Sequence, residues 1–263
     1  MLWINGRTGS EASLVIDDGF FYGRGVFETL RVGTQPCFWQ EHLVRLNQSL
    51  VALKIRPPLD EQELLALVKS LPIRDCVLKI AVSSENLVLQ TRPLPAETLP
   101  AWKLTLAAGH RTASRLLLSS KNLNYLDDLL AWENARTAGY DDAIWLDAAG
   151  RIAETSRANL FFLRGGCLMT PDQECGLLPG IARQWVMDHY PVQAGFYTLN
   201  DLLAAEAVFV TNSVIGIQPV AVVCEYAFAD SLAVRRIRQE YQECLNCLNR
   251  QTSSCQLPIY PLE

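Results

Sequence analysis

Several features are scarce or missing in this 263-residue chain, and each absence narrows what the protein can be. Basic residues are outnumbered, 23 Lys and Arg against 28 Asp and Glu, and they form no cluster, which argues against nucleic-acid binding. No apolar run reaches the roughly 18 residues of a membrane-spanning helix. The first residues lack a charged leader followed by an apolar stretch, so no secretory signal peptide is expected. With 49% apolar and 19% charged residues, the composition predicts a soluble globular protein, which we expect in the cytoplasm.

The eight cysteines form no metal-binding pattern. Cys244 and Cys247 make a C-x-x-C within a stretch of helical character, without a second C-x-x-C or a nearby histidine pair. A structural zinc site needs four such ligands, so no metal is expected. Most of the other cysteines stand singly among apolar or turn residues, which favours reduced, buried thiols in an intracellular protein.

Lysine is also scarce, and the five lysines limit the candidates for amine chemistry. Lys54 and Lys69 occupy polar positions of predicted helices and are expected in solvent. Lys79 lies in an apolar predicted strand, where its surroundings could lower its pKa. Lys121 is followed 33 residues later by Glu154. A lysine and a carboxylate are what pyridoxal-phosphate chemistry requires, since the lysine forms a Schiff base and the acid keeps the pyridine nitrogen protonated. The residue pattern alone leaves Lys79 and Lys121 as rivals for the reactive lysine.

Local patterns predict two domains of the α+β class. The first part reads as a hairpin of strands 2–5 and 12–16, a turn at 17–19, strands 27–32, 77–82 and 87–89, and helices 40–54 and 61–70. Three prolines between Arg92 and Pro100 mark a linker, which gives an N-terminal domain 1–91, a linker 92–101 and a C-terminal domain 102–263. The second domain reads as strands 102–107, 143–146, 151–155, 159–163 and 167–170, a hairpin within 207–220, helices 181–189 and 229–249, and an irregular tail 251–263. A leucine stripe at 123, 126, 129 and 130 predicts a further helix that begins at Lys121 and stops at Gly139.

Motifs between Ile4 and Val220 resemble, in order, those of the fold-type IV pyridoxal-phosphate enzymes. They are Gly25-Val-Phe-Glu-Thr-Leu-Arg, His42-Leu-Val-Arg-Leu, Lys121-Asn-Leu-Asn-Tyr-Leu, Gly139-Tyr-Asp-Asp-Ala-Ile, Glu154-Thr-Ser-Arg-Ala-Asn-Leu-Phe, Leu177-Leu-Pro-Gly-Ile, and Thr211-Asn-Ser with Gly216-Ile-Gln-Pro-Val. That family contains branched-chain aminotransferases, D-amino-acid aminotransferases and 4-amino-4-deoxychorismate lyases. The resemblance implies pyridoxal 5′-phosphate as cofactor, a small N-terminal α/β domain, a larger C-terminal mixed-sheet domain and a homodimer.

The resemblance also assigns residues to the cofactor. It selects Lys121 over Lys79 as the Schiff-base lysine and Glu154 as the partner of the pyridine nitrogen. Arg45 would hold the phosphate in its guanidinium fork, although on pattern alone it lies off the apolar stripe of its helix and reads as a solvent-facing side chain. Tyr125, placed one helical turn after Lys121, would reach the phenolic oxygen of the cofactor.

Further phosphate contacts are implied at the start of helix 181–189. Free N–H groups at a helix start bind anions, so Gly180 and Ile181 are backbone candidates, although without the resemblance the segment is a plain Pro-Gly turn. Ser213 matches the family position that gives a hydroxyl to the phosphate. Glu154 by itself would read as an ordinary surface-strand glutamate.

The Thr211-Asn-Ser and Gly216-Ile-x-Pro-Val motifs resemble the lyase branch more closely than the transaminases, which usually carry Gly-Thr-Ala there. The expected reaction converts aminodeoxychorismate, a small-molecule substrate, to 4-aminobenzoate and pyruvate in folate biosynthesis. Thr29 is the candidate hydroxyl that protonates the leaving group, unless it only packs at a strand end. Arg24, Arg111 and Asn212 are candidates for the two substrate carboxylates, although many members carry Asp in place of Arg24.

Two alternatives stay open at this point. A D-amino-acid or branched-chain aminotransferase of the same fold would need a second half-reaction with a keto acid, which nothing in the sequence forbids. A noncatalytic binding protein with a decayed site would need the lysine, acid and phosphate motifs to be lost, and they are all present. An assay for 4-aminobenzoate distinguishes the lyase from the aminotransferase. A protein that stays colourless with added cofactor would favour the noncatalytic binding protein.

Overall fold

The computed structural model describes residues 1–96, 100–111, 117 and 119–250. Part of the predicted linker, 97–99, and the predicted irregular tail, 251–263, lie outside the described residues. The chain divides into two compact units that alternate along the sequence. The first unit holds Met1–Pro95, Ser120–Tyr125 and the described residues from Leu245 on. The second unit holds the described parts of Ala96–Ser119 and of Leu126–Cys244.

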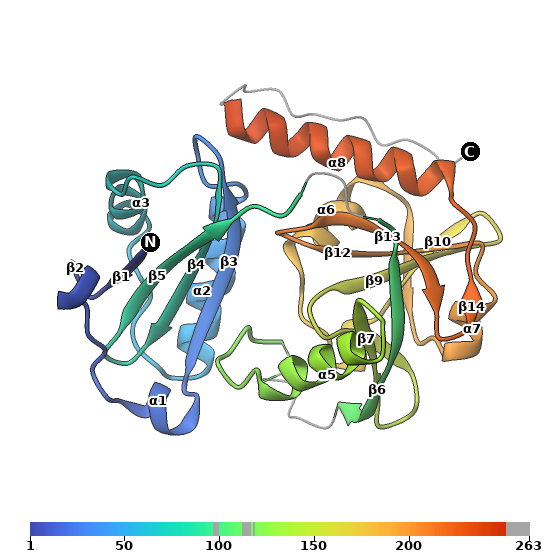
Figure 1. Ribbon diagram of the computed structural model, residues 1–263, viewed down its shortest axis with the longest axis horizontal. Helices are drawn as coiled ribbons and strands as arrows, with labels where there is room; N and C mark the ends of the chain where they lie inside the picture. Colours follow the sequence, from blue (N-terminus) through green and yellow to red (C-terminus); the bar gives the residue numbers. More distant parts are fainter. Residues whose placement is uncertain (97–99, 112–116, 118, 251–263) are drawn as a thin grey trace. The chain divides into compact units, whose positions relative to one another are not determined.

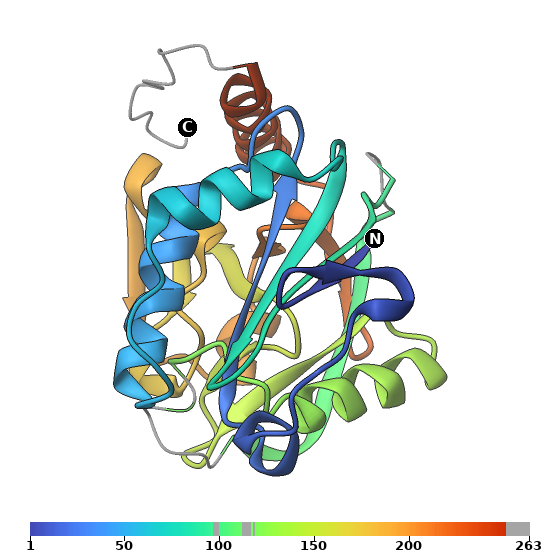
Figure 2. The ribbon, with the colours of Figure 1, turned by 90° about the vertical axis from the view of Figure 1, so that its left-hand side faces the viewer.

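The first unit is an antiparallel sheet of five strands with the helices α2 and α3 on one face (Figures 1 and 2). The strand order is β2-β1-β5-β4-β3. The strands are β1 (Leu2–Ile4), β2 (Arg7–Thr8), β3 (Gly25–Val32), β4 (Cys76–Ser83) and β5 (Leu87–Pro93). The helices are the 3-10 turn η1 (Gly9–Glu11), α1 (Asp18–Tyr22), α2 (Trp39–Ala52) and α3 (Glu61–Ser70). The predicted strand 12–16 is wrong, because β1 pairs within the hairpin with Arg7–Thr8 instead.

The core of this unit lies between the sheet and its two longer helices. Alternate residues of β3 and β4, such as Leu30 and Leu78, meet the apolar stripes of α2 and α3. The helix Glu61–Ser70 begins and ends where the sequence predicts, because the Asp60 carboxylate accepts a hydrogen bond from the Glu63 N–H at 2.8 Å and caps it. The other alternate residues of β3 and β4 therefore point to the opposite face of the sheet, away from α2 and α3.

The second unit is built on a mixed sheet of nine strands (Figure 1). Its order is β11-β10-β9-β12-β13-β6-β7-β8, and β14 pairs with β13. The strands are β6 (Trp102–Arg111), β7 (Asp142–Asp147), β8 (Ile152–Thr155), β9 (Asn159–Arg164), β10 (Cys167–Pro171), β11 (Val192–Gly195), β12 (Ala207–Asn212), β13 (Gly216–Val223) and β14 (Tyr226–Ala227). The helices are α5 (Leu126–Thr137), η2 (Gln173–Cys175), α6 (Ile181–His189), α7 (Leu199–Leu203) and α8 (Leu232–Arg250), of which the part from Leu245 on belongs to the first unit.

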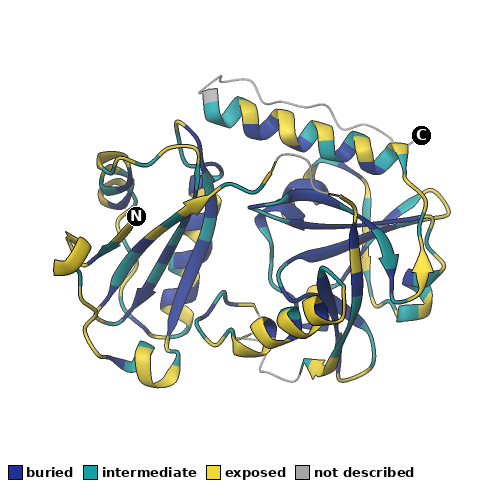
Figure 3. Ribbon diagram, viewed as in Figure 1, coloured by how far each residue is buried: buried dark blue, intermediate teal, exposed yellow. Residues whose placement is uncertain are grey.

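Burial in the second unit follows the central strands (Figure 3). Phe161 and Phe209 stack between β9 and β12 with ring centroids 5.0 Å apart. The predicted leucine stripe of α5 is wrong: Leu126 and Leu130 are 63% and 46% exposed, whereas Ala131 and Ala135 are buried. The small alanines let α5 lie close to β7, and the leucines point away. No helix in the described part of the chain is long and apolar enough to span a bilayer.

Candidate active site

Lys121 lies in a short extended segment of the first unit. The Phe27 N–H donates to the Lys121 carbonyl at 2.8 Å, and the Leu123 N–H donates to the Gly25 carbonyl at 2.9 Å. A Cβ at Gly25 would come 2.8 Å from the Val82 carbonyl oxygen and 2.5 Å from Leu123 Cδ1, so a larger residue would force the backbone here to shift. The prediction that Lys121 stands at the start of a helix is wrong, because α5 begins five residues later, at Leu126. Lys121 is instead anchored through its backbone along the outer edge of β3.

The side chains of two lysines lie close to the Phe27 ring. Lys121 Nζ lies 4.6 Å from the ring centroid, and Lys79 Nζ lies 4.3 Å from it. Tyr125 meets Phe27 edge to face at 5.5 Å, and Lys121 Nζ is 5.4 Å from the Tyr125 ring. Tyr125 is therefore close to Lys121 as expected, but through Phe27 and an extended segment and not along a helix. Both candidates for the reactive lysine stand beside one aromatic ring.

Arg45 is buried, which contradicts its solvent-facing interpretation. Its Nε and Nη2 each donate to the Glu28 carboxylate at 2.7 Å, and His42 Nδ1 lies 2.6 Å from Glu28 Oε2. Glu28 is 1% exposed. Burial acts to raise its pKa, but the charges and hydrogen bonds of Arg45 and His42 outweigh burial and lower that pKa to about 2. Burial lowers the pKa of His42 despite Glu28. The phosphate role of Arg45 stays a prediction.

Two other predicted residues of the first unit differ in their surroundings. Thr29 is half-buried in β3, and its hydroxyl makes no hydrogen bond within the described residues. Arg24 is exposed, pairs with Asp18 at 3.2 Å and donates to the Lys54 carbonyl. The Arg24 guanidinium therefore joins Asp18 of α1 to the backbone that follows α2, and its role toward the substrate stays a prediction.

Glu154 belongs to the second unit and is 6% exposed on β8. Its Oε2 accepts from Asn159 Nδ2 at 3.0 Å, and its Oε1 accepts from the Leu178 N–H at 3.1 Å. Arg111 Nη2 lies 3.3 Å from Oε1. The carboxylate is thus fixed in orientation by an amide, a backbone N–H and an arginine. A fixed, buried carboxylate suits the predicted contact with a protonated ring nitrogen.

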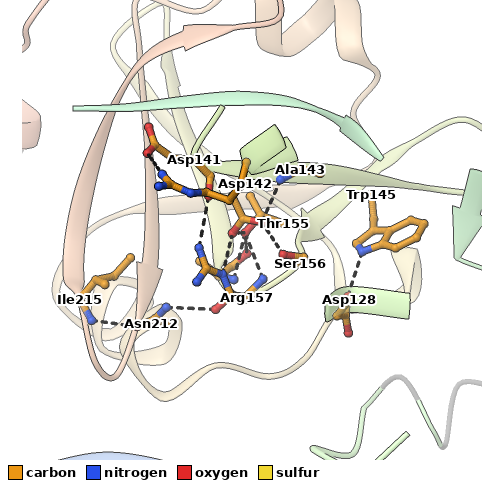
Figure 4. A network of polar contacts seen from close by, with 12 residues as sticks. Asp128, Asp141, Asp142, Ala143, Trp145, Thr155, Ser156, Arg157, Asn212 and Ile215 are labelled. Atoms are coloured by element: carbon orange, nitrogen blue, oxygen red, sulfur yellow. Dashed lines mark hydrogen bonds and ion pairs between the residues drawn. The ribbon is translucent and has the colours of Figure 1, made fainter. Parts of the chain in front are cut away.

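Arg111 is shared between two carboxylates. Its Nη2 donates to Asp128 Oδ1 at 2.7 Å, and Trp145 Nε1 donates to the same oxygen at 2.9 Å (the Asp128–Trp145 bond is drawn in Figure 4). Asp128, on α5, was not found by sequence reasoning, because an acid in the first turn of a helix reads as a solvated dipole partner. Arg111 therefore positions Glu154 within the unit, and its predicted contact with the substrate stays untested.

A buried aspartate organises the segment that follows Glu154 (Figure 4). Asp142 accepts from the Thr155 hydroxyl at 3.0 Å and from the Ser156 hydroxyl, and Arg157 Nε is 3.7 Å away. Burial raises the pKa of Asp142 against the opposing pull of Arg157 and the hydroxyls. The Ala158 N–H donates to Thr155 Oγ1 at 3.0 Å, which closes the turn. The Thr-Ser pair after Glu154 thus holds the backbone that aims the glutamate.

Asn212 clamps the turn between β12 and β13. Its Nδ2 donates to the Arg157 carbonyl at 3.0 Å, and its Oδ1 accepts the Val214 and Ile215 N–H groups at 2.8 Å (Figure 4). All of these contacts are within the protein, so the structure gives Asn212 a positioning role. Ser213 lies half-buried in the same turn, with no side-chain hydrogen bond in the described part of the chain.

The start of α6 suits an anion. Gly180 is its N-cap, no side chain caps it, and its first turn carries no acidic residue. A Cβ at Gly180 would come 1.9 Å from Asn159 Oδ1, so a larger residue would displace the Asn159 side chain, which donates to Glu154. Unfilled N–H groups at the start of this nine-residue helix, with Ile181 at its first position, can receive a phosphate. Each unit thus carries groups of the kind that pyridoxal phosphate needs: an amine at Lys121 in the first unit, and a fixed acid at Glu154 with an anion-binding helix start in the second.

Comparison with known proteins gives a family. The model described as amino-transferase class IV matches residues 25–223. An aminodeoxychorismate lyase of Bacillus subtilis is 28% identical over 83% of this chain and 85% of its own length. A putative branched-chain-amino-acid aminotransferase of Methanocaldococcus jannaschii is 29% identical over 83% of this chain and 86% of its own.

Solved structures agree in fold. A 4-amino-4-deoxychorismate lyase of Pseudomonas aeruginosa is 28% identical with a TM-score of 0.81, over 92% of this chain and 98% of its own. A branched-chain aminotransferase bound to N-(5′-phosphopyridoxyl)-L-glutamate is 22% identical with a TM-score of 0.83, over 96% and 95%. The predicted fold-type IV architecture is confirmed.

Proposed function

This chain belongs to the class IV aminotransferase family, and from that premise we propose that it is a 4-amino-4-deoxychorismate lyase. The protein is an enzyme, and its cofactor is pyridoxal 5′-phosphate. The proposed reaction releases 4-aminobenzoate and pyruvate from aminodeoxychorismate, a step of folate biosynthesis. Lyases and aminotransferases are about equally similar to the chain, so the choice needs an observation within the molecule.

The turn between β12 and β13 provides the observation that favours the lyase over the aminotransferase. Transaminases of the family usually place Gly-Thr-Ala where this chain has Thr211-Asn-Ser. Asn212 ties that turn to the Arg157 carbonyl, in the segment that follows Glu154. An alanine or threonine at that position could not make the same three hydrogen bonds, because it lacks an amide. The lyase-like motif is therefore part of how the acid side of the site is built, which supports the lyase proposal.

When bound, the cofactor supplies an electron sink for the substrate carbon that carries the amine. We propose that Lys121 Nζ holds the cofactor and, once displaced, removes the proton from that carbon. The Glu154 carboxylate holds a proton at the ring nitrogen. The Thr29 hydroxyl gives a proton to the departing enolpyruvyl group. Arg45, the N–H groups at Gly180 and Ile181 and the Ser213 hydroxyl are the proposed phosphate ligands.

The test is a product assay on the purified holoenzyme. Freshly generated aminodeoxychorismate is supplied and 4-aminobenzoate is followed by chromatography, with Lys121→Ala as the inactive control and Lys69→Met as the matched lysine control. The proposal expects product from the wild type and from Lys69→Met only. A yellow protein that makes no 4-aminobenzoate but transfers amino groups from D- or branched-chain L-amino acids to a keto acid would establish the aminotransferase alternative.

We further propose a cytoplasmic homodimer. Members of the family are generally dimeric, and the exposed rings of Phe21 and Tyr22, 64% and 74% exposed on α1, offer apolar surface to a second copy. Size-exclusion chromatography with light scattering tests the state, and Phe21→Ser with Tyr22→Ser should shift it toward the monomer. A monomeric wild type at micromolar concentration would refute this part of the proposal.

A further inference from the structure

Four side chains of the second unit form one cluster, although they come from four different elements. Arg111 ends β6, Asp128 lies in the first turn of α5, Trp145 lies on β7 and Glu154 lies on β8. The three strands are neighbours in the sheet, with β7 between β6 and β8. The side chains of Arg111 and Asp128 are 12% exposed and that of Glu154 is 8% exposed, so water screens their charges weakly.

A single nitrogen of Arg111 faces both carboxylates of the cluster. Nη2 donates to Asp128 Oδ1 at 2.7 Å, and it lies 3.3 Å from Glu154 Oε1. The two carboxylate oxygens therefore lie within 6.0 Å of each other, which is the sum of these two distances. Because attraction between charges weakens with distance, the Arg111 charge acts more strongly on Asp128 than on Glu154.

Trp145 holds this pair of charges in place through two contacts. Its Nε1 donates to Asp128 Oδ1 at 2.9 Å, the same oxygen that accepts from Arg111 (Figure 4). The guanidinium carbon of Arg111 lies 5.5 Å from the centroid of the Trp145 ring. The Trp145 side chain is itself buried. Neither the Asp128 carboxylate nor the Arg111 guanidinium can therefore turn away without losing a contact with Trp145.

The packing of α5 on the sheet does not require a buried acid. Two alanines of this helix, Ala131 and Ala135, already pack against apolar residues of β7. A buried ion pair adds little stability compared with apolar side chains of similar size, because the cost of desolvating the charges offsets their attraction. The buried charge of Asp128 is therefore better explained by its effect on the charged groups around it.

Glu154 also interacts with a second cation, from α6. Burial lowers the pKa of Arg183, and the charges of Asp172 and Glu154 oppose that effect. Arg111 and Arg183 thus place two positive charges around one carboxylate. A cation near Glu154 opposes protonation of a ring nitrogen held by that carboxylate, because it repels the added proton. Asp128 offsets one of these two cations.

We propose that Asp128 is a positioning residue for the acid of the cofactor site, which neutralises Arg111 so that Glu154 can keep the ring nitrogen of the cofactor protonated. Trp145 holds Asp128 in the orientation that this role needs. The inference rests on the proposed role of Glu154 at the ring nitrogen. It does not depend on whether a lyase or an aminotransferase reaction follows.

The test follows the ring nitrogen itself and not the turnover. Holoenzyme is prepared with pyridoxal 5′-phosphate that carries ¹⁵N in the ring, and the ¹⁵N chemical shift, which differs between the neutral and the protonated nitrogen, is measured across pH. Asp128→Asn keeps Oδ1 as the acceptor for Arg111 and Trp145 and removes the charge. This variant should lose the ring proton about one pH unit lower than the wild type, a roughly tenfold weaker hold on the proton. The control is Asp127→Asn, which removes an exposed acid of the same helical turn and should titrate like the wild type.

A double variant separates the charge of Asp128 from its place in the fold. Asp128→Asn combined with Arg111→Gln removes both charges of the pair, so the titration should move back toward that of the wild type. A purely structural role predicts further loss in the double variant and no recovery. Identical titration of the wild type and Asp128→Asn, or the absence of recovery in the double variant, would overturn the inference.

Glu154→Gln distinguishes this inference from the proposals on which it rests. If Glu154→Gln loses the ring proton early but Asp128→Asn titrates like the wild type, the role of Glu154 stands and the inference about Asp128 is wrong. A Glu154→Gln variant that titrates like the wild type would overturn both. If Asp128→Asn titrates as expected but the wild type makes no 4-aminobenzoate, the lyase proposal alone is refuted and the inference is supported.

Discussion

Among the described residues, each unit buries one glutamate, and the two glutamates are held in opposite ways. Glu28, in the first unit, receives both arms of the Arg45 guanidinium and a histidine nitrogen. Glu154, in the second unit, is held by an amide and a backbone N–H, and its arginine is shared with Asp128. Glu28 is thus matched by charge inside its own unit and ties α2 to β3. Glu154 is fixed in orientation by neutral donors as well as by Arg111, an arginine that it shares with Asp128.

The largest expected effect comes from removing the negative charge of Glu28. Glu28→Gln keeps the shape but leaves the Arg45 guanidinium buried without its counter-charge. The free energy of unfolding should fall by about 3–4 kcal/mol, as for other broken buried ion pairs. Urea denaturation of the apoprotein measures it, because the phosphate of bound cofactor would give Arg45 a second counter-charge and would add to apparent stability.

The exposed Glu63 on α3 supplies the control, and Glu63→Gln should change stability by less than about 0.5 kcal/mol. A loss below about 1 kcal/mol in Glu28→Gln would mean that Arg45 has another counter-charge and that the ion pair does not hold the helix to the sheet.

Acid should remove the same interaction without a mutation. In the folded protein the pKa of Glu28 is lowered to about 2, against the ordinary 4.5 of a glutamate carboxyl. A lowered pKa stabilises fully above the unfolded value, so this contribution is present above pH 4.5 and is lost as pH falls toward 2. The shift corresponds to about 3 kcal/mol. The stability of the wild type should decline over this window, and the decline should be shallower in Glu28→Gln, where Asp17 still contributes.

The role of Glu154 is tested by the turnover of a variant that lacks its charge. Glu154→Gln keeps the shape of the side chain but replaces one carboxylate oxygen with an amide nitrogen, so only one of its two donors, Asn159 Nδ2 and the Leu178 N–H, keeps an acceptor. The neutral amide also cannot hold a proton at the ring nitrogen. Turnover should fall by about a hundredfold, equivalent to about 2.7 kcal/mol. Steady-state kinetics and the absorbance of bound cofactor measure the two effects, with the exposed Glu174→Gln as control. Turnover within threefold of the wild type would remove Glu154 from the mechanism.

The smallest expected effect concerns the support of Glu154. Thr155→Val removes the hydroxyl that donates to buried Asp142 and accepts from the Ala158 N–H. Stability should drop by about 1–2 kcal/mol, and turnover should fall severalfold because the glutamate is less well aimed. The exposed Thr137→Val is the control. Full turnover with reduced stability would show that Thr155 supports the fold and not the orientation of Glu154.

Local signals predicted some elements to the residue. Helices Glu61–Ser70 and Ile181–His189 match their predicted bounds because the features that begin them, Asp60 as a capping carboxylate and the Pro-Gly turn, act within a few residues. The prediction of a helix that begins at Lys121 is wrong, because local signals do not decide the structure of this segment. Its leucine spacing is local, whereas the segment around Lys121 is decided by hydrogen bonds to β3, which lies nearly a hundred residues earlier.

The sequence by itself indicated the family and the order of its motifs, and it gave Lys121 and Glu154 as candidates, because these are matters of residue identity and spacing. Only the tertiary structure decided that Arg45 turns to Glu28, that Asp128 and Asp142 support the acid side, and that Lys79 stands between Thr29 and Gln90. The physical reason is the distance along the chain over which each kind of interaction acts. Periodicity and capping act over a few residues, but strand register and buried charge pairing join residues far apart in the chain, and they are set by the packing of the whole unit.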